Sequence, residues 1–335
     1  MKVYLSIIIP AYNAALTIED LLGSIRKSRK VDLREVEVVV VDDRSIDNME
    51  EVFYNSYKRY KNYKYYKLTK NSGPARARNE GVRQAKGEVV LFLDSDVKLF
   101  PHTLRELISS FKKDPDLFAT TGVWDKKQKS KHFFPKFKAL RDWSYWIHDR
   151  DQRGYYFLFS TRIAAIRKDL FVRLGGFNTS YKAALVEDIE LTYRIARRYA
   201  VIFNPKLKVS HEFEDFLPIA RKYFWRSFYW SRLYATRRKF DPVATTSQEA
   251  ITTVSAVAVV GMGIISLSQI SLIRQIGLIG IVGFFALHLF GVRKFLYYCL
   301  KEEGLGFAAK SLLVGFVLYL VIFAGAFYSL VSLKE

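Results

Sequence analysis

Residues 89–96 read VVLFLDSD, which is five apolar residues followed by two aspartates that flank a serine. A short apolar run of this kind is typical of a β-strand that is buried on both faces of a parallel sheet. Similar runs occur at Val3–Ile9 and at Val36–Val41, and Pro10 ends the first of them. The N-terminal half of the chain therefore predicts a buried parallel sheet.

Helical segments alternate with these strands. In Ala14–Ser28, apolar residues recur at helical spacing, for example at Ile18, Leu21 and Ile25. The other expected elements are helices at Asp47–Tyr60, Pro74–Ala85 and Pro101–Lys112 and a short strand at Tyr63–Leu68. This alternation predicts a doubly wound α/β sheet, in which ligands bind outside the carboxyl ends of the strands.

Polar residues follow four of the expected strands at these carboxyl ends. They are Pro10 to Asn13, Asp42 and Asp43, Asn71 to Pro74, and Asp94 to Asp96. Asp94 and Asp96 flank a single residue, so both carboxylates can face one mouth of the sheet and hold a divalent cation. Their hard oxygen atoms suit Mg²⁺ or Mn²⁺. The alternative for this pair is a solvated turn before the helix that starts at Pro101.

The net charge is +20, from 53 Lys and Arg against 33 Asp and Glu. About +18 of it lies in the first 248 residues, because residues 249–335 carry six basic and four acidic side chains. This excess predicts an anionic partner: a nucleotide, a nucleic acid or an acidic membrane face. The apolar share of 50% excludes a disordered chain, and the single cysteine, Cys299, excludes a disulfide scaffold and a cysteine-rich metal site.

The last quarter of the chain is apolar enough for a bilayer. Ala250–Leu272 and Ser311–Leu333 are each 23 residues without a charge, and Gln275–Val292 is 18 such residues. As helices they would be about 34 Å and about 27 Å long, against a hydrocarbon core of about 30 Å. We therefore expect a transmembrane domain of about three helices at 249–335. A buried core helix is the alternative for the middle segment.

Basic residues near the expected spans predict the orientation. Positive side chains precede the first span and follow the second, whereas the turn between them holds only Arg274; the others are Arg237, Arg238, Lys239, Arg293, Lys294, Lys301 and Lys310. Because cytoplasmic loops are enriched in Lys and Arg, this distribution places the N-terminal domain and the 293–310 loop in the cytoplasm. The expected location is the cell membrane, multi-pass, with the large domain on the cytoplasmic face.

The segment before the spans combines basic and aromatic side chains. From Arg221 to Lys239 there are seven Lys or Arg, seven aromatic residues and no acid. Such a composition predicts amphipathic interface helices at 216–248 that bind anionic membrane lipids. It would also suit single-stranded nucleic acid, but the adjacent apolar span favours lipid, and no nucleic-acid partner is expected. A second basic stretch, Lys126–Lys138, is expected to be a mobile loop that covers the active site or contacts phosphates.

Taken in order, six motifs resemble those of the inverting glycosyltransferases of family 2, which have the GT-A fold. They are PxYN at Pro10–Asn13, VVVVDDxS at Val38–Ser45, NxGxxxARN at Asn71–Asn79, DxD at Asp94–Asp96, GGF at Gly175–Phe177 and EDxEL at Glu187–Leu191. The resemblance covers roughly residues 3–215 and implies a GT-A catalytic domain at 1–215, with a Rossmann-like mixed sheet and helices on both faces.

The resemblance assigns the binding of a nucleoside-diphosphate sugar to the strand-end residues. The implied donor-binding residues are Pro10, Tyr12, Asn13, Asp42, Asp43, Asn71, Gly73, Arg76, Asp94, Ser95 and Asp96. Asp43 would accept hydrogen bonds from the base, although Asp42 could instead be a turn residue. Of the two arginines in the third motif, Arg76 is expected to contact phosphate and one is expected to be a solvated surface charge. Asp96, Asp94 and His211 are the implied metal ligands, and a structural histidine is the alternative for His211.

The resemblance also implies residues for the acceptor. Asp188 would be the general base and Glu187 a neighbour that tunes it, and the alternative is a pair of helix-capping acids. Trp124 would stack on the acceptor sugar or belong to the core. Arg221 and Trp225 stand where processive members, such as cellulose and hyaluronan synthases, carry QxxRW, but the Gln and Arg of that pattern are absent.

These features together imply a membrane-anchored, metal-dependent, inverting hexosyltransferase. Its donor would be a nucleoside-diphosphate sugar, with GDP-mannose favoured, and its acceptor a lipid-linked group or glycolipid. The cofactor would be Mn²⁺ or Mg²⁺. The alternatives are a processive polysaccharide synthase and a UDP-glucose-dependent polyprenyl-phosphate glucosyltransferase.

Overall fold

The computed structural model describes residues 2–149, 156–180, 186–240 and 246–332, and these separate into two compact units. The first, here called the sheet unit, comprises Met1–Lys129 and Asp151–Glu212. The second, here called the helical unit, comprises Ser130–Arg150 and Phe213–Glu335. Residues 130–150, which the expected domain bounds place with the catalytic domain, group with the C-terminal helices.

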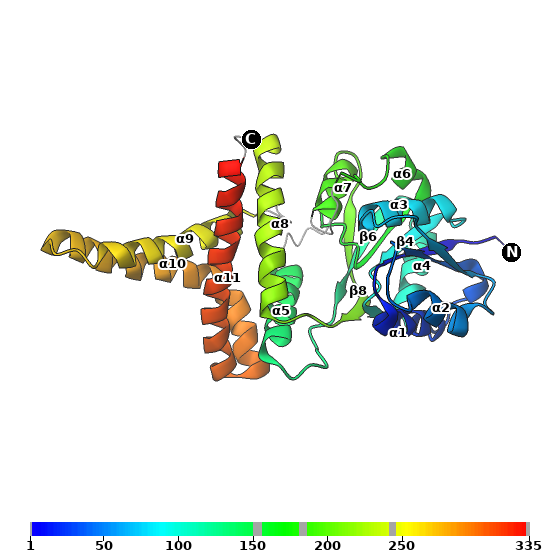
Figure 1. Cartoon of the computed structure of the whole chain (residues 1–335), viewed down its shortest axis with the longest axis horizontal. Helices are drawn as coiled ribbons and strands as arrows, with labels where there is room; N and C mark the ends of the chain where they lie inside the picture. Colours follow the sequence, from blue (N-terminus) through cyan, green and yellow to red (C-terminus); the bar gives the residue numbers. More distant parts are fainter. Residues whose placement is uncertain (1, 150–155, 181–185, 241–245, 333–335) are drawn as a thin grey trace. The chain divides into compact units, whose positions relative to one another are not determined.

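An eight-stranded mixed sheet, in the order β3-β2-β1-β4-β7-β6-β8-β5, forms the centre of the sheet unit (Figure 1). The strands are β1 Leu5–Ala11, β2 Val36–Asp42, β3 Tyr63–Lys67, β4 Val89–Leu93, β5 Val97–Leu99, β6 Ala119–Trp124, β7 Ile163–Arg167 and β8 Val201–His211. The helices are α1 Ala15–Arg26, α2 Met49–Tyr57, α3 Pro74–Gln84, α4 Thr103–Lys113, α6 Lys168–Arg173 and α7 Glu187–Ile195, with a 3₁₀ turn at Leu33–Glu35. Strands β1 to β4 pair in parallel, and β7 pairs antiparallel with both β4 and β6. The predicted mixed α/β sheet is confirmed.

Burial explains why the apolar runs form the central strands. All seven residues of β1 and all seven of β2 are buried. The first strand ends two residues later than predicted, because β1 continues to pair with β2 as far as Pro10 opposite Val41 and Ala11 opposite Asp42. Its pairing with β4 ends earlier, at Ile8 opposite Phe92. The proline therefore lies beyond the β1–β4 ladder and interrupts none of its hydrogen bonds.

Helix α3 packs directly on this centre. A Cβ atom at Gly81 would lie 2.4 Å from Ile8 Cγ2 and 3.2 Å from Val41 Cγ2. A helix backbone that comes so close to β1 and β2 fixes the direction in which each α3 side chain points. The residues of α3 on the sheet side are thereby aimed at the interior of the unit.

The described residues of the helical unit form five α-helices and a short π-helical turn at Tyr145–Asp149. The helices are α5 Phe133–Ser144, α8 Phe216–Arg237, α9 Ser247–Ile265, α10 Ser271–Glu303 and α11 Leu305–Val331. In Figure 1, α8 lies beside α11 and α9 lies beside α10. Phe137 of α5 is buried in a cluster with Ile219 of α8, Phe295 of α10 and Leu318 of α11. The expected loop through Lys138 is therefore wrong from Phe133 onward, because apolar packing makes that stretch a helix.

A polar contact also ties α5 to the C-terminal helices. Arg141 Nη2 donates to Glu249 Oε1 of α9 (2.8 Å), and Arg141 Nη1 donates to the Tyr223 hydroxyl of α8 (2.6 Å). The guanidinium also lies over the ring of Tyr319 of α11, 5.2 Å from its centroid. One basic side chain thus joins α5 to three other helices of the unit.

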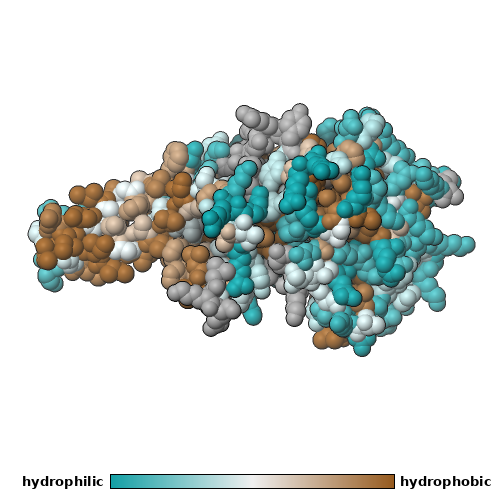
Figure 2. All heavy atoms as spheres, turned by 90° about the horizontal axis from the view of Figure 1, so that it is seen from above, coloured by the Kyte–Doolittle hydropathy of each residue, from teal (hydrophilic) through white to brown (hydrophobic). Residues whose placement is uncertain are grey.

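Helices α9, α10 and α11 are each long and apolar enough to cross a membrane, with 19, 33 and 27 residues. Apolar side chains cover the free end of the α9–α10 pair (Figure 2), where Leu267 is 77% and Ile279 73% exposed. The prediction of three such helices is confirmed. Residues 293–303 are not the predicted loop, because they continue α10 to Gly304, whose φ of +90° ends the helix.

A glycine in α11 allows α8 to pack closely against it. A Cβ atom at Gly325 would lie only 2.2 Å from the carbonyl oxygen of Phe224. Gly325→Ala should therefore force the two helices apart and lower the free energy of unfolding by about 1–3 kcal/mol. Thermal unfolding of the full chain in detergent measures this loss.

Gly283→Ala is the matched control for Gly325→Ala. Gly283 lies in α10, and a Cβ atom there would meet no atom within 4 Å. Alanine has the higher helix propensity, so this variant should be unchanged or slightly more stable. Equal stability of the two variants would contradict the close packing of α8 on α11.

Candidate active site

The residues after β1 and β2 form one connected turn region. Asn13, at φ +51°, accepts a hydrogen bond on Oδ1 from the Ile46 backbone (3.0 Å), and its own N–H donates to Ser45 Oγ (2.9 Å). Pro10 is buried within β1, whereas the side chain of Tyr12 is 49% exposed. An exposed ring beside a fixed turn is available to stack on a planar group.

The two aspartates that end β2 have different surroundings. Asp42 is fully buried; it accepts hydrogen bonds from the Ser45 N–H (2.7 Å) and from the Tyr65 hydroxyl (2.6 Å). These contacts favour the turn role for Asp42. Asp43 accepts the N–H groups of Ser72 and Gly73 on its two oxygens, each at 2.7 Å.

Asp43 therefore fixes the loop that precedes α3. Burial raises the pKa of Asp43, and the nearby Asp42 raises it further, while the two N–H groups oppose the rise. Gly73 occupies φ +86°, a conformation that favours glycine. The proposed base-binding aspartate thus also holds the loop of the third motif, in which Asn71 is exposed.

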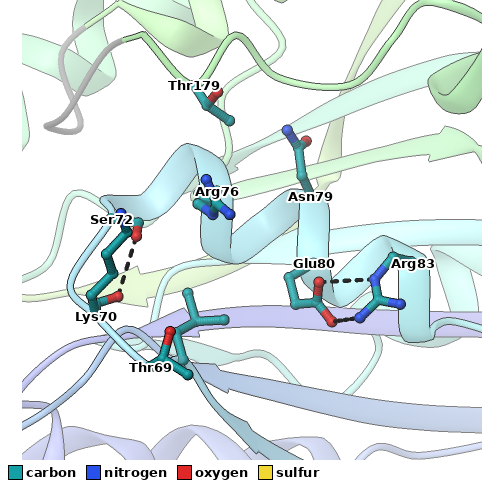
Figure 3. A pocket seen from close by; sticks show the side chains of 9 residues that line it. Thr69, Lys70, Ser72, Arg76, Asn79, Glu80, Arg83 and Thr179 are labelled. Carbon is teal, nitrogen blue, oxygen red and sulfur yellow. Dashed lines mark hydrogen bonds and ion pairs between the residues drawn. The ribbon is translucent and has the colours of Figure 1, made fainter.

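A pocket of about 330 Å³ lies on the outer side of α3 (Figure 3). It is lined by Leu68, Thr69, Lys70, Ser72, Arg76, Asn79, Glu80, Arg83 and Thr179. Arg83 is paired with Glu80 (2.6 Å), whereas Arg76 is exposed. Asp43, Asp94 and Asp96 do not line this pocket. Arg76 is thus the exposed arginine of the motif, and its contact with phosphate stays a prediction.

Arg78 is the buried arginine of the motif, with 2% of its surface exposed. Its Nη2 donates to Asp94 Oδ1 (2.8 Å), and its Nη1 donates to Glu187 Oε1 (2.9 Å). Burial alone would lower the pKa of Arg78, but the two carboxylates outweigh it and raise the pKa, so the guanidinium remains charged. This side chain joins the DxD motif to the EDxEL motif.

Asp96 forms a second contact, with His211. The two residues lie on neighbouring segments, since Val97 pairs with His211 between β5 and β8, and His211 Nε2 lies 3.3 Å from Asp96 Oδ2. Burial would raise the pKa of Asp96, but the hydrogen bond from His211 and the charge of Arg162 hold it below its usual value. Asp96 remains about half-exposed, at 51% of its side chain.

A carboxylate oxygen and an imidazole nitrogen suit Mn²⁺ or Mg²⁺ chemically. Asp96 and His211 therefore fit the expected metal ligands, with Asp94 two residues away. Within the described part of the chain, however, no three His, Cys, Asp or Glu side chains gather as a metal group. Asp94 Oδ1 instead accepts a hydrogen bond from Arg78. Ser95, between the two aspartates, is half-buried.

Glu187 and Asp188 begin α7, as predicted. Glu187 is 2% exposed, and Asp188 is half-buried. Asp188 Oδ1 accepts the N–H of Ile189 (2.8 Å), and an acid in the first turn is favoured by the helix dipole. Through Glu187, Arg78 and Asp94, the structure connects Asp188 to the DxD motif.

The GGF motif is attached to the same helix as Arg78. Asn79 Nδ2 donates to the Phe177 carbonyl (2.8 Å), and Asn79 Oδ1 accepts the Phe177 N–H (2.9 Å). Gly175 and Gly176 both have positive φ, +80° and +70°. Phe177 packs near Arg78, whose Cζ lies 5.6 Å from the ring centroid. Three of the six motifs thus meet around Arg78 and Asn79.

The three residues proposed for the acceptor belong to two different units. Trp124, at the end of β6, is 1% exposed, and the Arg162 guanidinium lies over its ring, 4.5 Å from the centroid. This placement favours the core role for Trp124. Arg221 and Trp225 belong to α8 of the helical unit, where Arg221 is exposed and Trp225 is 36% exposed.

Arg78 and Asn79 were not predicted as functional residues. A signal for Arg78 was present, because Ala75, Arg78 and Val82 fall on one face of the helix at spacings of three and four. An arginine within an apolar helical stripe must be balanced by an acid. For Asn79, the sequence offered only its position as the last residue of the NxGxxxARN motif as a sign of function.

Comparison with known proteins identifies the family. The family model "Glycosyl transferase family 2" matches residues 6–185, which is more than half of the chain. The chain belongs to glycosyl transferase family 2. Residues 6–185 are accordingly a glycosyltransferase domain, and the resemblance to family 2 is confirmed.

Curated relatives match over a short region. Poly-beta-1,6-N-acetyl-D-glucosamine synthase of Staphylococcus epidermidis is 35% identical over 118 residues, which is 35% of this chain and 28% of the relative. The Staphylococcus aureus synthase is 31% identical over 118 residues, with the same coverage. The match thus spans less than a third of the length of these relatives.

Solved structures share the GT-A fold. Mannosyltransferase PcManGT from Pyrobaculum calidifontis, in complex with GDP-Man and Mn²⁺, has a TM-score of 0.61 at 19% identity and covers 98% of this chain and 88% of its own. GalNAc-T7 with UDP, GalNAc and Mn²⁺ has a TM-score of 0.52 at 19% identity and covers 71% of this chain and 51% of its own. The predicted fold is confirmed.

The GGF turn offers a direct test of this geometry. A Cβ atom at Gly176 would lie 2.7 Å from Asn79 Oδ1, whereas at Gly175 nothing lies within 4 Å. Both substitutions to alanine strain a positive φ, at about 1 kcal/mol each. Only Gly176→Ala also displaces Asn79, so we expect it to lower the free energy of unfolding by about 1–2 kcal/mol more than Gly175→Ala.

Chemical unfolding of the two glycine variants, followed by circular dichroism, makes this comparison. Because both variants carry the same added methyl group and a similar backbone strain, their difference isolates the contact with Asn79. Equal losses of stability would show that the Asn79–Phe177 contact is not formed as described.

Proposed function

We propose that this chain transfers a hexose, with inversion, from a nucleoside-diphosphate sugar to a lipid-linked acceptor. The observation that carries the proposal is the acid cluster of the sheet unit, in which Arg78 links Asp94 to Glu187. It puts a DxD motif and a candidate base in one connected group, as a single displacement of a diphosphate by a hydroxyl requires.

In this mechanism, Asp188 removes the proton of the acceptor hydroxyl as that oxygen attacks the anomeric carbon. The bond from this carbon to the diphosphate breaks on the opposite side, so the configuration inverts. Asp188 is half-buried, and its neighbour Glu187 accepts a hydrogen bond from Arg78. These surroundings suit a general base, because its carboxylate must be oriented toward the acceptor hydroxyl. Tyr12 and Asp43 would bind the nucleotide base, and Arg76 its phosphates.

A divalent ion, when bound, would neutralise the charge of the leaving diphosphate. We assign its binding to Asp96 and His211, with Asp94 as a further ligand. The hydrogen bond from His211 lowers the pKa of Asp96, and this favours the ionised carboxylate that a hard cation requires as a ligand.

The donor that we propose is GDP-mannose. In support, the structure of the Pyrobaculum mannosyltransferase in complex with GDP-Man is similar to 98% of the present chain. A polysaccharide synthase is the second candidate, favoured by the 35% identity to poly-beta-1,6-N-acetyl-D-glucosamine synthase. The absence of the Gln and Arg of QxxRW from residues 221–225 speaks against the second.

The lipid nature of the acceptor is inferred from the composition of the chain. The family 2 domain is covalently joined to three helices that are apolar and long enough to cross a membrane. An enzyme that is held in a bilayer encounters lipid-borne acceptors at high local concentration. We place the enzyme in the cell membrane with its catalytic domain in the cytoplasm, as the basic residues beside the spans indicate.

The donor class can be tested by thermal unfolding with nucleoside diphosphates. GDP with Mn²⁺ should raise the melting temperature of the purified full chain, because a ligand that binds only the folded state stabilises it. GDP without metal should give a smaller shift, and UDP with Mn²⁺ little or none. A larger shift with UDP would favour the second candidate, and no shift with either nucleotide would contradict the donor site.

Asp188→Asn tests the base. An asparagine oxygen can still accept the Ile189 N–H, so stability should hold, while the transfer rate should fall by about 10²–10⁴-fold. The measurement is transfer of labelled sugar, from the donor that the nucleotide panel identifies, to a membrane lipid extract.

The matched control for this base variant is Asp169→Asn. Asp169 is also an acid in the first turn of a helix of the sheet unit, and its side chain is 67% exposed. It should transfer sugar at the unaltered rate. Wild-type activity in Asp188→Asn would overturn the assignment of the base.

A further inference from the structure

Arg78 is buried, and its positive charge therefore requires a neutralising anion. Its helix lies against β1 through Gly81, and its side chain is only 2% exposed. A buried guanidinium is tolerated in a protein when anions neutralise it and accept its hydrogen bonds. The identity of those anions therefore determines which segments of the chain come together here.

The two anions come from different motifs and bind different nitrogens. Asp94 follows β4 and contacts Nη2, whereas Glu187 is the first residue of α7 and contacts Nη1. The guanidinium thus bridges two carboxylates instead of forking onto one. Because its plane is rigid, the bridge fixes the separation between the end of β4 and the start of α7.

We propose that Arg78 is a positioning residue that holds the base Asp188 in register with the donor-binding end of β4. This inference rests on the proposed function, because it takes Asp188 as the base. Asp188 follows Glu187 in the first turn of α7. Because Arg78 binds Glu187, it also fixes the backbone position of Asp188. Asp94 is held by the same group on the donor side.

The geometry explains why this position needs an arginine. Lysine would supply the charge, but it has one terminal nitrogen and cannot reproduce two contacts of 2.8 and 2.9 Å from separate atoms of a rigid plane. Without any cation, Asp94 and Glu187 would face each other as like charges, and Glu187 is 97% buried by side-chain area. The start of α7 would then move away from β4.

Arg78→Lys is the first test, with Arg173→Lys as the matched control. Arg173 is an exposed arginine of the same unit that also pairs with an aspartate, Asp169. We expect Arg78→Lys to lower kcat for sugar transfer by about 100-fold, while the dissociation constant of the nucleoside diphosphate changes less than about threefold. Arg173→Lys should change neither. A wild-type kcat in Arg78→Lys would overturn the proposal.

A double variant separates positioning from stability. Arg78→Met should lower the melting temperature because it leaves Glu187 buried and unpaired, and adding Glu187→Met should restore much of that loss. If Arg78 positions the base, kcat of the double variant stays at least about 30-fold below wild type although the protein is stable. Recovery of kcat together with stability would show a purely structural role and overturn the inference.

Two further outcomes keep the test decisive. Should the double variant not fold, Glu187→Ala replaces it, because alanine cannot accept the hydrogen bond from Arg78 Nη1; kcat must then fall at least about tenfold, and an unchanged kcat overturns the proposal. Wild-type kcat in Asp188→Asn would instead remove the base role itself. That result is a failure of the proposed function, and it is distinguishable from any result on Arg78.

Discussion

A buried positive charge between two carboxylates is the constraint on which the rest of the catalytic domain depends. Arg78 cannot turn to solvent, because Gly81 holds its helix against β1, so Asp94 and Glu187 must come to it. These acids are 93 residues apart in the sequence, and each begins or follows a regular element. Satisfying one guanidinium therefore brings a strand end and a helix start to the same place.

Helix α3 and the loop before it bind four other segments of the sheet unit. Its N-terminal loop is bound to β2 by Asp43, and Arg78 binds the two acids. Asn79, the next residue, holds the GGF turn by both hydrogen-bonding groups of its amide. This short helix and its loop, which carry one family motif, thus contact four of the other five, although these motifs lie far apart in the chain.

Much of the fold and part of the site could be predicted from the sequence. Apolar runs and their carboxyl-end acids located the strands and the motifs, because burial and periodicity are local signals. Helix α5 was missed, since its stability comes from Phe137 packing on helices that follow 80 or more residues later. Arg76 and Arg78 share one motif, and only their contacts distinguish the exposed from the buried one.

Helix α10 has 33 residues and is therefore about 50 Å long, roughly 20 Å more than the thickness of a bilayer's hydrocarbon core. In an untilted helix that crosses a bilayer, this surplus would lie in the aqueous phase or among the headgroups, and the charged end from Arg293 to Glu303 suits those surroundings. Phe295 and Cys299 lie in this surplus and pack with Phe137 of α5. Helix α10 is thus one continuous helix with an apolar N-terminal part and a charged C-terminal part. Helix α5 packs against the charged C-terminal part.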